Sequence, residues 1–288
     1  MGRYRKILVA ADGSESSKNA FRQACAIGRL DKSWITVITT IPAYLDQYQL
    51  LNIREKVSAA LHEEGKNILA EIGRIASEED AFIKTILDEG SPYTTIVDRA
   101  DEGNFDLIVM GRHGRKGVER MERALVGSVT ARVIGNSQRD VLVIPQAASI
   151  GWNTILFATD GSKYSASAME KAIDLARSYG GRLMAVSVVD VTEEFLAQAP
   201  EAVERLVETA KEYLSDVKER AAAAGVAVDT LVREAEAHHA ITQLAAKNKA
   251  DVIIMGSHGR TGVRRLLMGS VTEKVIGYAP CPVLVVRT

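Results

Sequence analysis

One stretch of the chain decides the fold that we expect: Met255-Gly-Ser-His-Gly-Arg-Thr-Gly-Val-Arg-Arg-Leu-Leu-Met-Gly-Ser-Val-Thr-Glu-Lys-Val-Ile276. The apolar residues 252–255 predict a buried strand, which runs directly into Gly256 and Gly259. After a basic loop, Gly269 and Ser270 open an amphipathic segment that is typical of a helix. A strand, a glycine-rich loop and a helix N-terminus together are the usual layout of a phosphate-binding site.

The first half of the chain holds a second copy of this stretch and of its surroundings. Three segments recur: residues 6–14 as 154–162, residues 106–114 as 251–259, and residues 127–130 as 269–272. The offset changes between segments and stays constant within each, as expected of one domain present twice. A period of this length is too long for a solenoid repeat, so we expect two domains, residues 1–147 and 148–288.

Strands alternate with helices in each copy, which predicts a parallel sheet covered on both faces. In the first copy, Ser14 or Ser16 is expected to cap the first helix and Gly28 to end it. The expected strands are 7–11, 35–41, 82–87, 107–110 and 141–144, then 155–158, 183–189, 228–232, 252–255 and 283–286.

Composition excludes several classes of protein. The formal net charge is −1, with 20 basic and 20 acidic residues before Pro145 and 16 and 17 after it, so neither half has the basic surplus of a nucleic-acid binder. No apolar run approaches the length of a membrane span, and no signal peptide precedes the first strand, so we expect a cytoplasmic protein. Cys25 and Cys281 lie in different halves without metal-ligand spacing, which favours buried thiols over a disulfide.

Ligands of an open parallel sheet bind beyond the carboxyl ends of its strands, where the strand order reverses. If the first and fourth strands of a copy are neighbours, Asp160 and Gly256 line one crevice, as do Asp12 and Gly111 in the other copy. Glycine lets the backbone approach a phosphate closely, and the free N–H groups of the helix that Ser270 opens would face the same anion.

Structural roles compete with this interpretation. A glycine after a strand is often a simple turn, and Ser270 with Glu273 can form a capping box that occupies the serine hydroxyl. His113 and His258 can hold a ribose or phosphate, or only bond to nearby backbone. Of the loop cations, Arg115 and Arg260, which directly follow the second glycine, are the contact candidates. No Gly-Lys-Ser or Gly-Lys-Thr is present, so this is not a P-loop.

With these residues quoted, both halves resemble universal stress protein domains over nearly the whole chain. Nucleotide-binding members of that family carry Gly-x2-Gly-x9-Gly-Ser/Thr, and the second half has Gly256, Gly259, nine intervening residues and then Gly269-Ser270. The resemblance implies an α/β fold of two tandem doubly wound domains, each a five-stranded parallel sheet of order 3-2-1-4-5 with helices on both faces. It also implies ATP or another adenine nucleotide as ligand, with magnesium or manganese.

By resemblance, the nucleotide would lie across the end of the first strand of the second domain, with its base near Val188 and its phosphates on the glycine loop. The implied contacts are Ala158, Thr159, Asp160, Val188, Met255, Gly256, His258, Gly259, Arg260, Gly269, Ser270, Val271 and Thr272. The corresponding residues of the first domain are Ala11, Asp12, Thr40, Gly111, His113, Gly114, Arg115, Gly127, Ser128, Val129 and Thr130.

The first half departs from the family pattern. Twelve residues instead of nine separate Gly114 from Gly127, Ala11 stands where the second half has Thr159, and Thr40 replaces the apolar Val188. We therefore expect a similar crevice in the first domain, with ATP binding expected mainly in the second.

The resemblance also implies partners. Family members often dimerise through their last strands, so residues 141–144 and 283–286 are expected to pair within this chain, and two chains can form a homodimer. Covering these apolar edge strands has a physical reason, because exposed strand edges promote aggregation. A regulatory protein partner, not identified by the sequence, is also expected.

Three functions remain open at this point. The leading one is a nucleotide-binding stress regulator or sensor with slow or absent ATP hydrolysis. The second is an ATP hydrolase or nucleotidyl transferase, for which Asp160 with a bound metal is the one available activating group. The third is a nucleotide-independent scaffold that presents a protein-binding surface.

Overall fold

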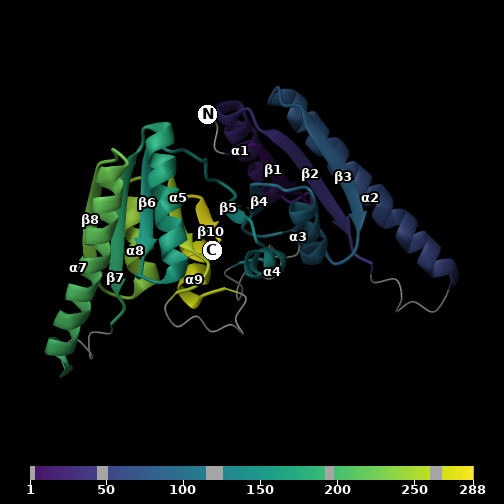
Figure 1. Cartoon of the computed structure of the whole chain (residues 1–288). Coiled ribbons are helices and arrows are strands. Elements are labelled where there is room, and N and C mark those ends of the chain that lie inside the picture. The colour runs from purple at the N-terminus through teal and green to yellow at the C-terminus, as the bar shows by residue number, and fades with distance from the viewer. Residues whose placement is uncertain (1–3, 44–50, 115–125, 192–197, 260–267, 288) are drawn as a thin grey trace. The chain divides into compact units, whose positions relative to one another are not determined.

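The computed structural model describes residues 4–43, 51–114, 126–191, 198–259 and 268–287 (Figure 1). The chain divides into two compact units, Gly2–Ala147 and Ala148–Thr288. Each unit is an open sheet of parallel strands connected by helices.

The first unit contains five strands. Its elements in chain order are β1 (Lys6–Ala10), α1 (Glu15–Asp31), β2 (Trp34–Ile41), α2 (Leu51–Glu78), β3 (Ile83–Glu89), α3 (Pro92–Glu102), β4 (Leu107–Gly111), α4 (Ser128–Asn136) and β5 (Asp140–Ile144). The strand order is β3-β2-β1-β4-β5, and all neighbours are parallel. Ile7 pairs with Ile35 on one side and Leu107 on the other, so the strand order reverses between β1 and β4.

The second unit repeats this topology. Its elements are β6 (Thr154–Thr159), α5 (Lys163–Tyr179), β7 (Arg182–Val189), α7 (Pro200–Ala223), β8 (Val228–Glu234), α8 (Ala237–Lys247), β9 (Val252–Gly256), α9 (Ser270–Tyr278) and β10 (Val283–Val286). The order β8-β7-β6-β9-β10 is again 3-2-1-4-5 with parallel neighbours, and β6 lies between β7 and β9. The predicted fold class is confirmed in both units.

Helices cover both faces of each sheet. In the first unit α1 and α2 contact one another and strands β1 and β2, while α3 and α4 contact one another on the opposite face. In the second unit α5 pairs with α7, and α8 with α9. All five residues of β4 and of β9 are buried, which explains why these strands read as continuous apolar runs.

The first helix of each unit begins as predicted, but one of the two ends differs. Ser14 accepts a hydrogen bond from the N–H of Ser17 (3.1 Å), and Ser162 caps α5 in the same way. Gly180 ends α5 in the left-handed region, with φ 68°. The prediction that Gly28 ends α1 is wrong: the helix continues to Asp31, and Lys32 takes the left-handed conformation.

Gly28 has a packing role instead. A Cβ at this position would lie 2.8 Å from Cδ1 of Ile35, so the missing side chain lets α1 pack closely against β2. Within the described residues, no helix is both long enough and apolar enough to cross a membrane.

Candidate functional site

The candidate site of the second unit lies at the carboxyl ends of β6 and β9. These strands are direct neighbours, with Phe157 paired to Ile254, so the loops that follow them emerge side by side. The β6 strand ends at Thr159 before Asp160, and β9 ends at Gly256. The strand neighbourhood assumed from the sequence is therefore present.

Asp160 joins these two loops. Its Oδ1 accepts a hydrogen bond from the N–H of Ser162 (3.0 Å), the residue that caps α5. On the other side, a Cβ added to Gly259 would lie 2.8 Å from Oδ2 of Asp160. The loop backbone at Gly259 therefore passes directly beside the carboxylate, which would have to shift to admit a side chain.

Gly256 has a different role from Gly259. A Cβ on Gly256 would lie 2.7 Å from the carbonyl oxygen of Tyr164, so its missing side chain makes room for the first turn of α5. The carbonyl of Gly256 accepts a hydrogen bond from the hydroxyl of Thr272 (3.1 Å), which ties α9 to the end of β9. Gly256 thus packs helix α5 onto the sheet, and Thr272 uses its hydroxyl within the protein.

The N-terminus of α9 lies against the loop that follows β9. Gly269 is the N-cap residue and donates its N–H to the carbonyl of Ser257 (3.0 Å). A Cβ on Gly269 would lie 3.4 Å from Cα of His258, an ordinary van der Waals distance. The first helical N–H groups therefore begin beside residues 257–259.

The alternative of a Ser270–Glu273 capping box is wrong. The N–H of Glu273 bonds to the carbonyl of Gly269 (2.9 Å), which makes Gly269 the cap and places exposed Ser270 one residue inside the helix. The cap makes no side-chain hydrogen bond. The first N–H groups of α9, which have no acceptor within a helix, thus donate no hydrogen bond to a side chain of the N-cap residue, and they carry the positive end of the helix dipole.

His258 lies in the same loop and contacts a residue that sequence reasoning missed. Its Nδ1 is 3.1 Å from Oγ of Ser257, and its ring centre is 5.3 Å from that of Tyr164. The ammonium of Lys163 lies 5.1 Å from the centre of the Tyr164 ring. Lys163 and Tyr164 belong to the first turn of α5, and their short distance from Asp160 in the sequence is the signal that could have identified them.

The remaining predicted contacts of the second unit surround this loop. Thr159 bonds through its hydroxyl to Oγ of Ser165 (3.1 Å) and accepts from the N–H of Gly161 (3.2 Å). Val188 is half-buried and directly follows Ser187, which pairs with Thr159 at the end of the sheet. Ala158 and Met255 are buried and Val271 is half-buried. Arg260 and Arg115 lie outside the described residues.

The first unit builds the same scaffold. Asp12 accepts through Oδ1 from the N–H (3.1 Å) and the hydroxyl (2.6 Å) of Ser14, and a Cβ on Gly114 would collide with Oδ2 of Asp12. Gly127 is the N-cap of α4 without a side-chain hydrogen bond, and its N–H bonds to the carbonyl of Arg112 (2.9 Å). Ser128 is the first residue of α4 and its side chain is exposed to solvent, as is Ser270 in α9. Val129 is half-buried.

The first unit repeats the threonine hydrogen bond at the end of the fourth strand, and its loop histidine has a shifted pKa. The hydroxyl of Thr130 donates to the carbonyl of Gly111 (3.1 Å), as Thr272 does to Gly256. Burial, and then the Arg112 guanidinium, lower the pKa of the imidazole of His113.

The side chains around the first crevice differ from those around the second. Ala11 is buried and offers no hydroxyl where Thr159 does. The hydroxyl of Thr40 is buried without a hydrogen-bond partner among the described residues. The first unit is also hollowed beside the turn after β1, where a cavity of about 540 Å³ is lined by Gly13, Ala60, Glu63, Glu64, Asn67, Ile68 and Glu71.

The equivalent turn of the second unit is filled. Gly161 packs against the ring of Tyr213 from α7, so closely that a Cβ there would collide with the ring. Three of the residues lining the first-unit cavity are glutamates, and one of them, Glu71, pairs with the ammonium of Lys18 (2.6 Å).

Comparisons with known proteins agree with the duplicated fold. A universal stress protein of Methanocaldococcus jannaschii is 40% identical over 141 residues, an alignment that covers 47% of this chain and 82% of that protein. A universal stress protein of Mycobacterium tuberculosis aligns over 98% of this chain and 96% of its own length, with 27% identity. Among solved structures, a universal stress protein from Archaeoglobus fulgidus superposes with a TM-score of 0.72 at 22% identity, covering 98% of this chain and 96% of that one.

The sequence profile of the universal stress protein family matches twice, at residues 3–145 and at residues 151–287. The two matches fall on the two units that the fold shows. The chain therefore belongs to the universal stress protein family, as a tandem member with one family domain in each half.

Proposed function

We propose that the second unit binds ATP at the crevice between β6 and β9, and that the chain acts as a stress-response regulator or sensor. One observation carries the proposal: Asp160, Gly259 and the uncapped N-terminus of α9 meet in one place. The nine-residue spacing between Gly259 and Gly269 also agrees with the nucleotide-binding pattern of the family.

The parts of the crevice fit the parts of a nucleotide. Backbone N–H groups of residues 270–272 begin helix α9 and are suited to phosphate oxygens, because they lack intrahelical acceptors and share the helix dipole. Half-buried Val188 offers an apolar surface to the base, and His258 belongs to the glycine loop that would hold the phosphates. Magnesium or manganese would accompany the phosphates, with Asp160 as the nearest carboxylate. We assign no hydrolytic step to these residues.

Gly269 gives the sharpest test of this proposal. Aspartate is a favourable N-cap residue, and the space for a Cβ at this position is adequate, so Gly269→Asp should fold normally. Its carboxylate would bond to the same N–H groups and repel phosphate. Isothermal titration calorimetry with ATP and magnesium should show binding by the wild type and loss of binding by Gly269→Asp.

Two control variants separate charge from other effects. Gly269→Ala adds the Cβ alone and should retain most of the affinity. Gly127→Asp places the same carboxylate at the equivalent cap of α4 and should leave second-unit binding intact, so a fall in stoichiometry in this variant would reveal a second ATP site in the first unit. Absence of ATP binding by the wild type, or equal binding by Gly269→Asp, would refute the proposal and favour a nucleotide-independent scaffold.

We also propose that β5 and β10 pair within the chain and that two chains can associate as a homodimer. Hydrogen exchange tests the pairing, because strand amides that point away from β4 and β9 exchange slowly only if they are covered. Sedimentation equilibrium tests the dimer. A cytoplasmic location and a regulatory protein partner stay predictions.

A further inference from the structure

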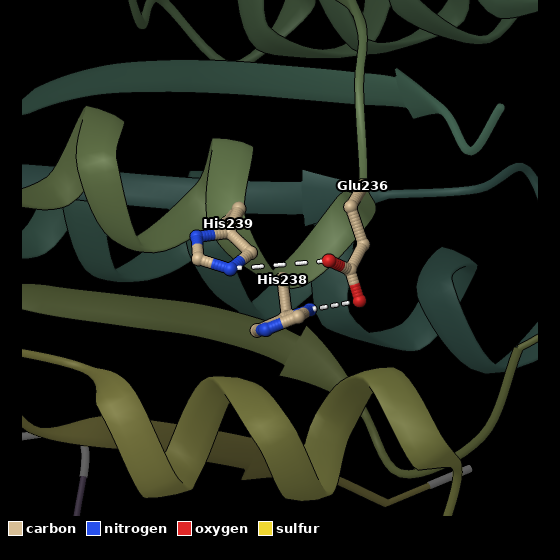
Figure 2. Close-up of side chains that lie close together, drawn as sticks. All are labelled: Glu236, His238 and His239. Carbon is tan, nitrogen blue, oxygen red and sulfur yellow. Dashed lines mark ion pairs between the residues drawn. The ribbon is translucent and has the colours of Figure 1, made fainter. Parts of the chain in front are cut away.

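Away from the crevice, three metal-ligating side chains converge at the start of α8 (Figure 2). Glu236 is the N-cap residue of this helix, and His238 and His239 lie in its first turn. One ligand atom from each residue lies within 4.8 Å of the other two. Across the ranges that the structure describes, this is the one group of three histidine, cysteine, aspartate or glutamate ligands that meet so closely.

We propose that Glu236, His238 and His239 bind one zinc ion through a carboxylate oxygen and two imidazole nitrogens, with water as the fourth ligand. Two histidines and one carboxylate, with an open fourth position, are a ligand set that zinc commonly takes in proteins. The same set disfavours magnesium and calcium, which require mainly oxygen ligands.

The distances are close to those of a tetrahedral site. Ligand bonds of about 2.1 Å place the ligand atoms of a tetrahedron about 3.4 Å apart. Nδ1 of His238 lies 3.1 Å from Oε1 of Glu236, and Nε2 of His239 lies 3.8 Å from Oε2 of the same carboxylate. The two imidazoles approach different oxygens of the carboxylate, so side-chain rotations would have to bring one oxygen and both nitrogens around one ion.

The surroundings hold His238 in position. Its side chain is 8% exposed, and its ring centre lies 4.4 Å from that of His239 and 5.5 Å from that of Tyr278. The N–H of Ala237 donates to Oδ1 of Asp190 (3.2 Å), which fixes the start of α8 to the end of β7. These contacts limit the rotation of the His238 ring and keep its Nδ1 beside Glu236.

Lys274 of α9 competes with the ion for the carboxylate. Its ammonium lies 2.9 Å from Oε1 of Glu236. Zinc must displace the ammonium to bind. Removing the charge of Lys274 should therefore tighten zinc binding, an effect that a purely structural ion pair does not predict.

The first unit lacks this ligand set. At the start of its equivalent helix, α3, stand Ser91, Pro92, Tyr93 and Thr94, and the guanidinium of Arg132 lies 5.2 Å from the centre of the Tyr93 ring. A cation and an aromatic ring thus occupy the place of the metal-ligating group. One zinc ion per chain, not two, is expected.

Calorimetric titration of the untagged full-length chain with zinc chloride, without nucleotide, tests the proposal. Glu236→Gln and His239→Gln change exposed side chains and should keep the fold. Since loss of an outer-shell partner already costs about 10- to 100-fold in metal affinity, each should weaken binding at least about tenfold. Lys274→Met should tighten binding. Cobalt in place of zinc should give the visible absorption of a tetrahedral ion in the wild type.

A matched control uses the histidine–glutamate pair of the first unit. Nε2 of His62 lies 2.7 Å from Oε1 of Glu89, and His62→Gln should leave zinc binding unchanged. Gly269→Asp should also bind zinc normally, which separates this site from the nucleotide site. Absence of zinc binding, unchanged affinity in both ligand variants, or equal loss in His62→Gln would overturn the proposal.

Discussion

The two units share a backbone design but line it with different side chains. In both, the carboxylate of an aspartate after the first strand lies beside a glycine of the second loop, and a glycine caps the helix that follows. Thr159 and Val188 of the second unit are replaced by Ala11 and Thr40 in the first. The residues that shape the scaffold thus recur in both units, while those that would select a ligand differ.

The largest expected difference between the units is in stability after a core substitution. Phe157 on β6 is fully buried, so Phe157→Ala should destabilise the second unit by about 3–5 kcal/mol, through lost burial and the cavity left behind. Thiol labelling in urea reports on each unit separately, because Cys25 and Cys281 are both buried and lie in different units. Burial raises the pKa of Cys25 to about 12, which suppresses its reaction in the folded unit.

In Phe157→Ala, Cys281 should become reactive at a lower urea concentration than Cys25. Simultaneous labelling of both thiols at a lower urea concentration would show instead that the two units unfold as one cooperative body.

A second substitution tests whether the scaffold is shared. Gly256→Ala brings a Cβ to 2.7 Å from the backbone of Tyr164, and Gly111→Ala brings one to 2.8 Å from the backbone of Ser16. Each should cost about 1–3 kcal/mol, measured by urea denaturation, because the helix must move away from the sheet. Gly73→Ala in α2 meets no atom within 4 Å and serves as the control. A large loss in only one of the two variants would contradict a common packing role.

The side chains at the end of β2 and of β7 can be exchanged. Thr40→Val removes a buried hydroxyl without a partner among the described residues, and it should stabilise the first unit by about 1 kcal/mol. Val188→Thr introduces a hydroxyl at a half-buried position and should destabilise the second unit by less. Calorimetric melting of both variants gives the result. A destabilised Thr40→Val would show that this hydroxyl has a bonding partner.

The smallest effect concerns pH. Burial and Arg112 lower the pKa of His113 in the folded unit below the unfolded value of 6.5. The unfolded chain then binds the proton more readily, so this contribution to stability is complete above about pH 6.5 and is lost as the pH falls toward the folded pKa. Urea denaturation between pH 7 and pH 5 should show a shallower pH dependence for His113→Asn. An identical slope in the variant would exclude this role.

Much of the fold could be predicted because apolar runs and the internal repeat can both be read directly from the sequence. Apolar runs such as Val252–Met255 mark strands buried on two faces, and the recurrence of residues 6–14 as 154–162 marks the duplication. The helix ends were less predictable. Gly28 resembles a glycine that ends a helix, but in the structure it lies within α1 and leaves room for the side chain of Ile35. Which of these roles a glycine has depends on packing that the sequence does not show.

The candidate site was predictable in its backbone and less so in its side chains. Spacing identified Gly259 and Gly269, but it did not separate the packing glycine, Gly256, from the loop glycine that contacts Asp160. The N-cap residue of α9 is Gly269, one residue earlier than the capping box requires, so Ser270 cannot form that box. The group at Glu236 escaped sequence reasoning because its histidines are adjacent, a spacing that matches no common metal motif, and Lys274 lies on another helix.

The two carboxylate oxygens of Asp160 link the crevice to the start of α5. One of its carboxylate oxygens holds the N–H of Ser162, the residue that caps α5, while the other faces the loop backbone at Gly259. If a ligand in the proposed site drew this carboxylate toward itself, its hydrogen bond to the N–H of Ser162 would lengthen, so the turn before α5 would respond to the ligand.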